Sequence, residues 1–173
     1  MSAMLGRPDS TEAAPAYFKY INQVAGDNPL PVIENQLEQC LAFFSKIDEA
    51  KSLHRYAPGK WSIRQVLNHV TDTERAMVFR ALWFARGFDT PLASFDQEIS
   101  SAAAEADRIS WAEHIEEFRR VRLATIPLFR NLPPQAWTYS GIANNSRITV
   151  RALAYVIPGH VTHHVTLLHE RYL

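Results

Sequence analysis

Two short signals in the sequence determine where its two longest helices begin. Ser62 is followed three residues later by Gln65, and Ser110 is followed three residues later by Glu113. Such pairs form capping boxes, in which each side chain bonds the backbone N–H of the other residue at the first turn of a helix. Apolar side chains follow each pair at helical spacing. The helices predicted in this way occupy residues 62–87 and 111–132.

Two further segments show the spacing of amphipathic helices. From about Pro31 onward, Leu37, Leu41 and Phe44 lie three and four residues apart. Thr149 can cap a last helix over residues 150–172. No segment has a convincing strand pattern, so we predict an all-α fold, a four-helix bundle of antiparallel or mixed topology.

The connection between the second and third predicted helices is unusually long. Residues 88–109 contain a proline, several acids and many small residues, with no sustained periodicity. Loops of this length in a compact domain are often functional. The run SFDQE supplies one aromatic ring and two acids, Phe95, Asp96 and Glu98. We expect this loop to lie beside the functional site of the protein and to help select a substrate. The alternative is a flexible, solvated linker.

The bulk composition excludes several classes of function. With 18 basic and 18 acidic side chains, the chain is a poor candidate for binding nucleic acid or an anionic membrane. No apolar run approaches the roughly 20 residues of a membrane span, so we expect a soluble, cytoplasmic protein. We divide it into a flexible N-terminal arm, residues 1–16, and one domain, residues 17–173. The single cysteine, Cys40, excludes a Cys-rich metal site, so any metal must be bound by imidazole.

The last predicted helix contains four of the seven histidines, within residues 160–169. At about 100° per residue, His160 and His164 fall inside the apolar arc of this helix. His163 lies just beyond the edge of the arc, and His169 lies near the opposite side. Side chains four residues apart meet on one face, as two ligands of one ion must. The alternative is that both are neutral, hydrogen-bonded core histidines.

A third ligand must come from another helix. The candidates are His54, His69 and His114. His54 lies in the turn before the second helix, and His114 lies among charged residues in the first turn of the third. His69 lies within a long helix, on a stripe that borders its apolar face, and is therefore our choice.

Pro158 and Gly159 interrupt the last helix immediately before the histidine pair. By helix propensity alone this dipeptide costs roughly 3–4 kcal/mol. We therefore expect a tertiary contact that compensates.

Two long runs, KWSIRQVLNHVTDTER and ALAYVIPGHVTHHVTLLHERYL, resemble the DinB/YfiT group of bacterial metal-binding four-helix bundles. The resemblance extends from about Tyr17 over the rest of the chain. It implies a metal held by one histidine of the second helix and by an H-x-x-x-H pair of the last helix. These positions correspond to His69, His160 and His164, which are also the residues chosen from the helical wheel.

Three imidazoles on two helices can bind zinc, nickel or iron and leave a coordination position open. An open position predicts a metal-dependent enzyme with a small-molecule substrate, and a zinc-activated water would make it a hydrolase. The resemblance adds a second reaction, in which the metal binds a low-molecular-weight thiol, as in a thiol S-transferase. The alternative is a non-catalytic, metal-stabilised stress-response bundle. We expect a homodimer.

No side chain stands out as a general base. Glu74 points away from His69 on the helical wheel, and Asp72, Asp96 and Glu98 are at most groups around the site. Arg80 shares the stripe of His69 and could hold an anionic substrate group. The alternative for Arg80 is a structural ion pair.

Overall fold

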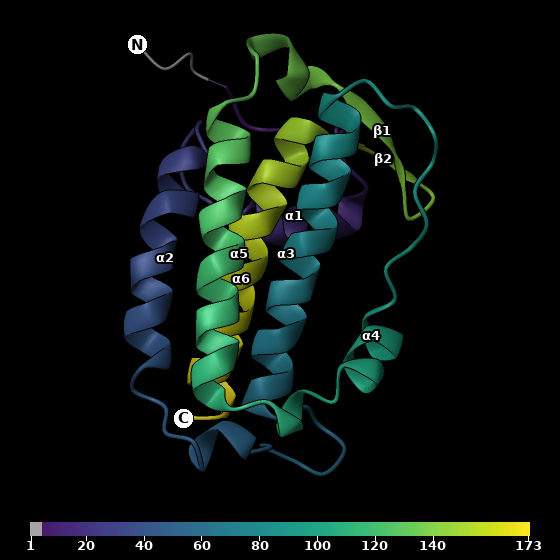
Figure 1. Ribbon diagram of the computed structural model, residues 1–173. Coiled ribbons are helices and arrows are strands. Elements are labelled where there is room, and N and C mark those ends of the chain that lie inside the picture. The colour runs from purple at the N-terminus through teal and green to yellow at the C-terminus, as the bar shows by residue number, and fades with distance from the viewer. Residues whose placement is uncertain (1–4) are drawn as a thin grey trace.

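The computed structural model describes residues 5–173, and its core is a bundle of four helices (Figure 1). These helices are α2 (Leu30–Phe44), α3 (Ile63–Ala85), α5 (Trp111–Arg130) and α6 (Val150–Arg171). The remaining elements are α1 (Phe18–Ile21), α4 (Gln97–Ala104), β1 (Ser140–Ala143) and β2 (Ser146–Thr149), with four short 3₁₀ turns among the described residues. The predicted all-α four-helix bundle is thus confirmed.

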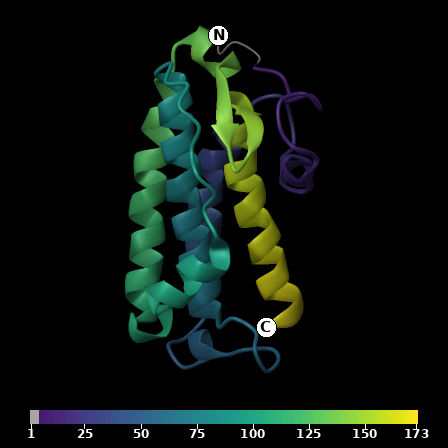
Figure 2. The ribbon, with the colours of Figure 1, turned by 90° about the vertical axis from the view of Figure 1, so that its right-hand side faces the viewer.

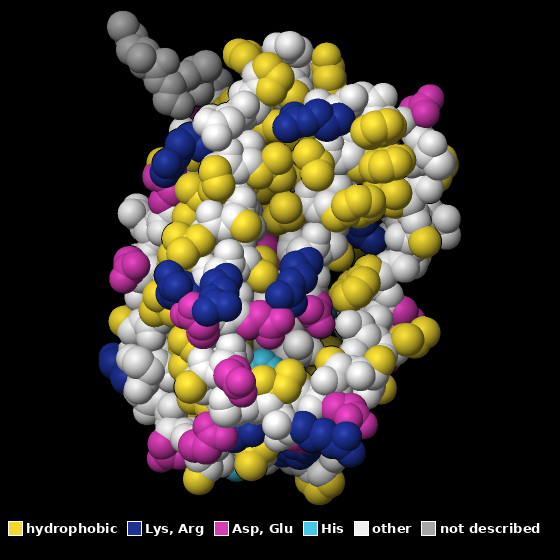
Figure 3. Space-filling view, in the orientation of Figure 1, with side chains coloured by type: hydrophobic (Ala, Val, Ile, Leu, Met, Phe, Trp, Pro, Cys, Tyr) yellow, Lys and Arg dark blue, Asp and Glu magenta, His cyan; other side chains and the backbone are white. Residues whose placement is uncertain are grey.

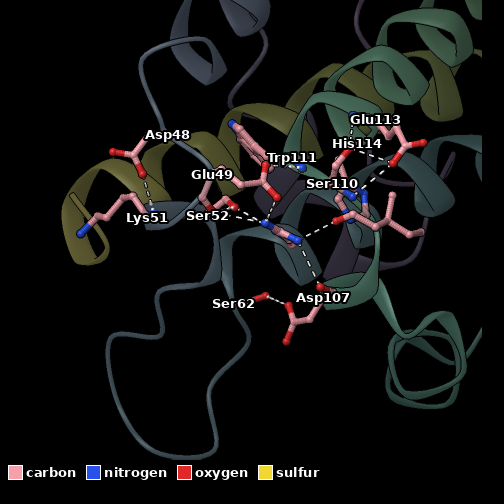
Figure 4. A network of polar contacts seen from close by, with 12 residues as sticks. Asp48, Glu49, Lys51, Ser52, Ser62, Asp107, Ser110, Trp111, Glu113 and His114 are labelled. Carbon is pink, nitrogen blue, oxygen red and sulfur yellow. Dashed lines mark hydrogen bonds and ion pairs between the residues drawn. The ribbon is translucent and has the colours of Figure 1, made fainter.

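Both predicted capping boxes are present. Ser62 accepts a hydrogen bond from the N–H of Gln65, and Ser110 accepts one from the N–H of Glu113. Figure 4 shows that the same end of the bundle holds a wider polar network, in which the backbone N–H of Trp111 donates to Glu49 at 2.9 Å. The starts of α3 and α5 are therefore tied to the loop that follows α2.

The order of helix directions explains the long connection. In Figures 1 and 2 the chain runs down α2, up α3, up α5 and down α6. Because α3 and α5 are neighbours and run in the same direction, the chain must return along the whole bundle between them. A 23-residue helix is about 35 Å long, and residues 86–110 span this distance.

The sequence predicted a loop without regular structure here, but the connection contains a helix. This helix is α4, whose N-terminus is capped by Asp96, with its carboxylate accepting hydrogen bonds from the N–H groups of Glu98 and Ile99 at 2.9 and 3.0 Å. The helix is one short segment of small residues, and so it has too few turns to show a periodic pattern.

A two-stranded hairpin precedes α6, in a segment for which the sequence predicted no strand. Strands β1 and β2 pair antiparallel and are joined by Asn144 and Asn145, whose φ angles are +52° and +56°. Two successive residues with positive φ are typical of a type I′ turn, and asparagine is among the residues that tolerate it. Four-residue strands are too short for a clear alternating pattern.

The described part of the N-terminal segment, residues 5–16, packs on the bundle and does not form the loosely attached arm that we expected. Glu12 is buried and forms an ion pair with Arg151. It also accepts a hydrogen bond from the hydroxyl of Thr149 at 2.8 Å. These partners lie more than 130 residues away in the sequence, which is why local composition does not reveal them. Residues 1–4 of the expected arm lie outside the described residues.

The Pro158–Gly159 dipeptide lies inside α6, which continues through it. A Cβ atom at Gly159 would lie 2.1 Å from the carbonyl oxygen of Tyr20. Glycine therefore lets α1 approach the backbone of α6, and Figure 2 shows the N-terminal segment beside this helix. The carbonyl of Pro158 accepts a hydrogen bond from the side-chain amide of Gln36 at 2.9 Å. These contacts are the expected compensation.

On the face of the molecule shown in Figure 3, positive and negative side chains lie next to one another in a band across the middle and again near the lower end. The ion pairs formed by α3 and α5 include Arg75 with Glu117 and Arg119 with Glu116, both at 2.7 Å. Among the described residues, no helix is sufficiently long and apolar to span a membrane.

Candidate metal centre

The structure brings His69 of α3 together with His160 and His164 of α6, two neighbouring antiparallel helices. The Nε2 atom of His160 lies 3.1 Å from that of His69 and 3.1 Å from that of His164. One ligand atom from each ring lies within 4.8 Å of the others. The geometry therefore places all three residues chosen from the sequence at one point.

The spacing of these nitrogen atoms fits a transition metal. Nitrogen ligands about 2.0–2.1 Å from a zinc ion stand roughly 2.9–3.4 Å apart. Each neutral imidazole has one N–H and one lone pair, so the converging Nε2 atoms either share N–H···N hydrogen bonds or direct their lone pairs at one cation. This donor set could hold zinc, nickel or iron.

All three imidazoles are held in the neutral form that a ligand needs. Burial lowers the pKa of His69 from 6.5 to about 4. Burial, followed by the charges of His69, His163 and Lys19, lowers the pKa of His164 to about 3. Burial also lowers the pKa of His160 well below its usual value. At neutral pH no proton competes for these nitrogen atoms.

Aromatic and polar side chains orient the rings. Tyr20 of α1 contacts His160 edge-on, with ring centroids 5.1 Å apart. Trp61 lies 5.0 Å from His69 by the same measure, and the hydroxyl of Thr73 lies 3.4 Å from His69 Nδ1. The Nδ1 atom of His164 is buried without a hydrogen-bond partner in the described structure.

The other histidines lie outside this cluster. The Nε2 atom of His114 is 2.8 Å from the carbonyl oxygen of Ala106, and His54 contacts the ring of Tyr172. His163 packs against Tyr20 beside the cluster, and His169 stacks on Phe43. None of the four contributes a ligand atom to the group of three.

The acids considered near the site have other partners. Glu74 is buried in an ion pair with Arg122, and Asp72 pairs with Arg75 on the surface. Asp96 caps α4. Glu98 remains as an acid that lines a cavity beside the histidines.

Two cavities of about 350 Å³ each flank the three histidines. The first cavity is lined by residues that include His69, His160, Thr73, Met77, Arg80 and Phe95. The second cavity is lined by residues that include His163, His164, Trp61, Lys60 and Glu98. Lys19, Tyr20 and Gln97 line both. Phe95 and Gln97 bring the long connection to the walls, as expected, and its role in substrate selection stays a prediction.

A model of the DinB superfamily matches residues 33–168. The chain belongs to the DinB superfamily. Among solved structures, YfiT from Bacillus subtilis is similar, with a TM-score of 0.69 and 18% identity over 94% of this chain and 89% of YfiT. It is described as a probable metal-dependent hydrolase with an unusual four-helix bundle topology.

A second solved structure is that of a mycothiol-dependent maleylpyruvate isomerase. Its TM-score is 0.69 and its identity 13%, over 84% of this chain. The DinB-superfamily protein covers 61% of that isomerase, so the isomerase is the longer chain. Because the sequence identities are only 18% and 13%, these two similarities show only that the chain shares the fold of these proteins. No curated protein sequence matches the chain.

Sequence reasoning missed the contribution of the N-terminal segment to the site. Lys19 and Tyr20 line both cavities, and Tyr20 also contacts His160. The sequence signal for this contact is Gly159, because a glycine inside a buried helix often marks a close backbone approach. That signal does not identify the segment that approaches.

Proposed function

We propose that His69, His160 and His164 of this DinB-superfamily protein bind one divalent transition metal and that the site is catalytic. The observation that supports this proposal is the convergence of three neutral imidazoles between two cavities. When bound, the metal would supply Lewis acidity, which lowers the pKa of a coordinated water or thiol. Zinc, nickel and iron all suit such ligands.

Thiol S-transfer is the reaction that the site favours. The described residues that line the first cavity include no aspartate or glutamate to act as a general base. A bound metal would lower the pKa of a coordinated thiol enough for its proton to pass to solvent, so this reaction would need no such base. The second cavity provides room for a second small molecule beside the same histidines. A low-molecular-weight thiol and an electrophile could thus occupy the two sides of the centre.

Hydrolysis is the second candidate. Glu98 lines the second cavity and could accept a proton from a water molecule beside His164. The likeness to YfiT, which is described as a probable metal-dependent hydrolase, supports this reading. The third candidate is a metal that only stabilises the bundle.

Metal content tests the site. Protein purified without a tag or chelating resin should contain about one transition-metal ion per chain. His160→Ala and His164→Ala should each lose most of it, because each removes one of three ligands, whereas His163→Ala and His169→Ala should retain it. Elemental analysis provides the measurement. A metal content that depends on His163 would overturn the assignment.

Turnover distinguishes the three candidates. The metal-loaded protein is given a low-molecular-weight thiol with an electrophile, and separately a model ester. Chelator-sensitive consumption of the thiol supports the transferase, and chelator-sensitive ester cleavage supports the hydrolase. A metal that raises the melting temperature without either turnover indicates the stabilising role.

A further inference from the structure

Three arginines are buried in the described part of the chain, and one of them differs from the others. Arg64 forms an ion pair with Glu49, and Arg122 forms one with Glu74 at 2.8 Å. Arg80 is 4% exposed and forms no ion pair with a carboxylate of the described residues. The structural ion pair considered from the sequence is therefore not present there.

The contacts of the Arg80 guanidinium leave much of its hydrogen-bonding capacity unused. Nη2 donates to the carbonyl oxygen of Ala93 at 3.3 Å, and Nη1 contacts the sulfur of Met77 at 3.7 Å. Both contacts are long, and sulfur is a weak acceptor. A guanidinium keeps its charge in proteins, and a buried charge without a counter-ion is costly. An anion from outside the chain would remove this cost.

The position of Arg80 connects it to the histidines. His69, Thr73, Met77 and Arg80 follow one another at intervals of three and four residues on one face of α3, and all line the first cavity. Eleven residues of helix extend about 16 Å. The side chain of a helical residue leans toward the helix N-terminus, which for Arg80 is the direction of His69. The cavity therefore runs from the histidines to a guanidinium.

The polarity of the cavity wall also suits an anion. Among the described lining residues, Lys19 adds a second positive charge, and no acid opposes it. Asn144 and Ser146 of the hairpin add an amide and a hydroxyl group. Phe95 and Tyr20 add aromatic surface to the wall, and Tyr20 does so beside His160.

We infer that the first cavity binds a small-molecule substrate that carries a carboxylate or phosphate group, which Arg80 receives at the end remote from the histidines. Arginine suits this role because its planar fork can donate two parallel hydrogen bonds to either group. The inference rests on the proposed function for the metal that would bind the other end of the substrate. Anion binding at Arg80 itself requires no metal.

Binding of simple anions to chelator-treated protein tests the Arg80 end alone. The probes are adipate, inorganic phosphate and the uncharged analogue adipamide, with affinities measured by calorimetry or NMR titration. We expect at least one anion to bind ten times more tightly than adipamide, and the stronger of the two anions identifies the group. Arg80→Gln should remove this preference. Arg86→Gln, an exposed arginine at the end of the same helix, should leave it unchanged.

A second pair of probes tests the whole cavity in metal-loaded protein. Suberic acid monohydroxamate has a metal-binding group at one end and a carboxylate at the other, and its methyl ester lacks the charge. We expect the acid to bind at least ten times more tightly than the ester in the parent protein. In Arg80→Gln, the acid and the ester should bind with equal affinity.

The parent protein alone can refute the inference, even if Arg80→Gln does not fold. Equal affinity for anionic and uncharged probes in both experiments would overturn it. Arg80→Lys keeps the charge but not the paired donors, so it should retain a reduced preference. Anion binding that depends on Arg80 in a protein that takes up no metal would support this inference while contradicting the proposed function.

Discussion

At the scale of single residues, the candidate site depends on histidines that the bundle keeps neutral. Removing an imidazole from water disfavours its charged form, so burial lowers the pKa of His69 and is the largest cause of the lowered pKa of His164. The same burial prepares the nitrogen atoms to bind a cation. It also makes the metal-free protein sensitive to acid.

The stability of the metal-free protein should rise with pH between about 4 and 6.5. Histidine has a pKa of about 6.5 in an unfolded chain, whereas the folded values for His69 and His164 are about 4 and 3. In this interval the unfolded state binds more protons than the folded state. The contribution of these histidines to the unfolding free energy is therefore fully present above about pH 6.5 and is lost as the pH falls. Each such histidine adds a slope of up to about 1.4 kcal/mol per pH unit.

Urea unfolding of chelator-treated protein at several pH values measures this slope. His69→Leu should reduce it, because the group that titrates is removed. His169→Gln should not change it, since His169 is exposed. An unfolding free energy that is flat across the interval would show that the folded histidines titrate normally.

At the scale of elements, α6 is shaped by its contact with α1. The glycine at position 159 admits the backbone of Tyr20, whose ring then lies against His160. Pro158 has no N–H to donate, but its carbonyl gains the Gln36 amide. The dipeptide that weakens the helix by propensity thus allows the N-terminal segment to close one side of the site.

Gly159→Ala should destabilise the protein, although the same change in most helices is favourable. In an exposed helix interior it would stabilise by about 1 kcal/mol. Here the new Cβ would meet the Tyr20 carbonyl at 2.1 Å, and such overpacking costs about 1–3 kcal/mol. Urea unfolding gives the sign. Thr166→Ala, at an exposed position of α6, is the control and should be nearly neutral. Stabilisation by Gly159→Ala would mean that α1 does not lie where the structure places it.

At the scale of the whole molecule, one buried polar network joins the four helices of the bundle. Arg122 of α5 donates to both carboxylate oxygens of Glu74 on α3, at 2.9 and 2.8 Å. It also donates to the side chain of Gln36 on α2 at 2.9 Å. Gln36 in turn donates to the carbonyl of Pro158 on α6. The network specifies how the helices are placed relative to one another.

Glu74→Gln should cost about 3–5 kcal/mol of unfolding free energy, because it leaves the Arg122 charge buried without its partner. Glu117→Gln breaks an exposed pair with Arg75 and should cost less than about 1 kcal/mol. The double variant Glu74→Leu with Arg122→Met should be more stable than Glu74→Gln, since neither charge remains. Chemical denaturation of the variants provides the comparison. Equal costs for Glu74→Gln and Glu117→Gln would contradict the role of the buried pair. The homodimer stays a prediction at this scale.

The sequence by itself determined the features that depend on local spacing. The capping boxes at Ser62 and Ser110 are local because both partners lie within one helical turn. The inward position of His160 and His164 is local because the helical period sets which face a side chain occupies. Four amphipathic helices without strands then left a bundle as the way to bury their apolar faces. The choice of His69 followed from the same periodicity and agreed with the family resemblance.

The tertiary structure alone decided the features that depend on distant partners. Three such features are the parallel direction of α3 and α5, the contact of Tyr20 with His160, and the lack of a carboxylate partner for Arg80 among residues 5–173. Each depends on segments far apart in the chain. The sequence does not reveal whether the counter-ion of an arginine is a carboxylate on a neighbouring helix or a group of a substrate. Only packing excludes water and brings specific groups within a few ångströms, and these two effects determine which charge is paired and which stays available.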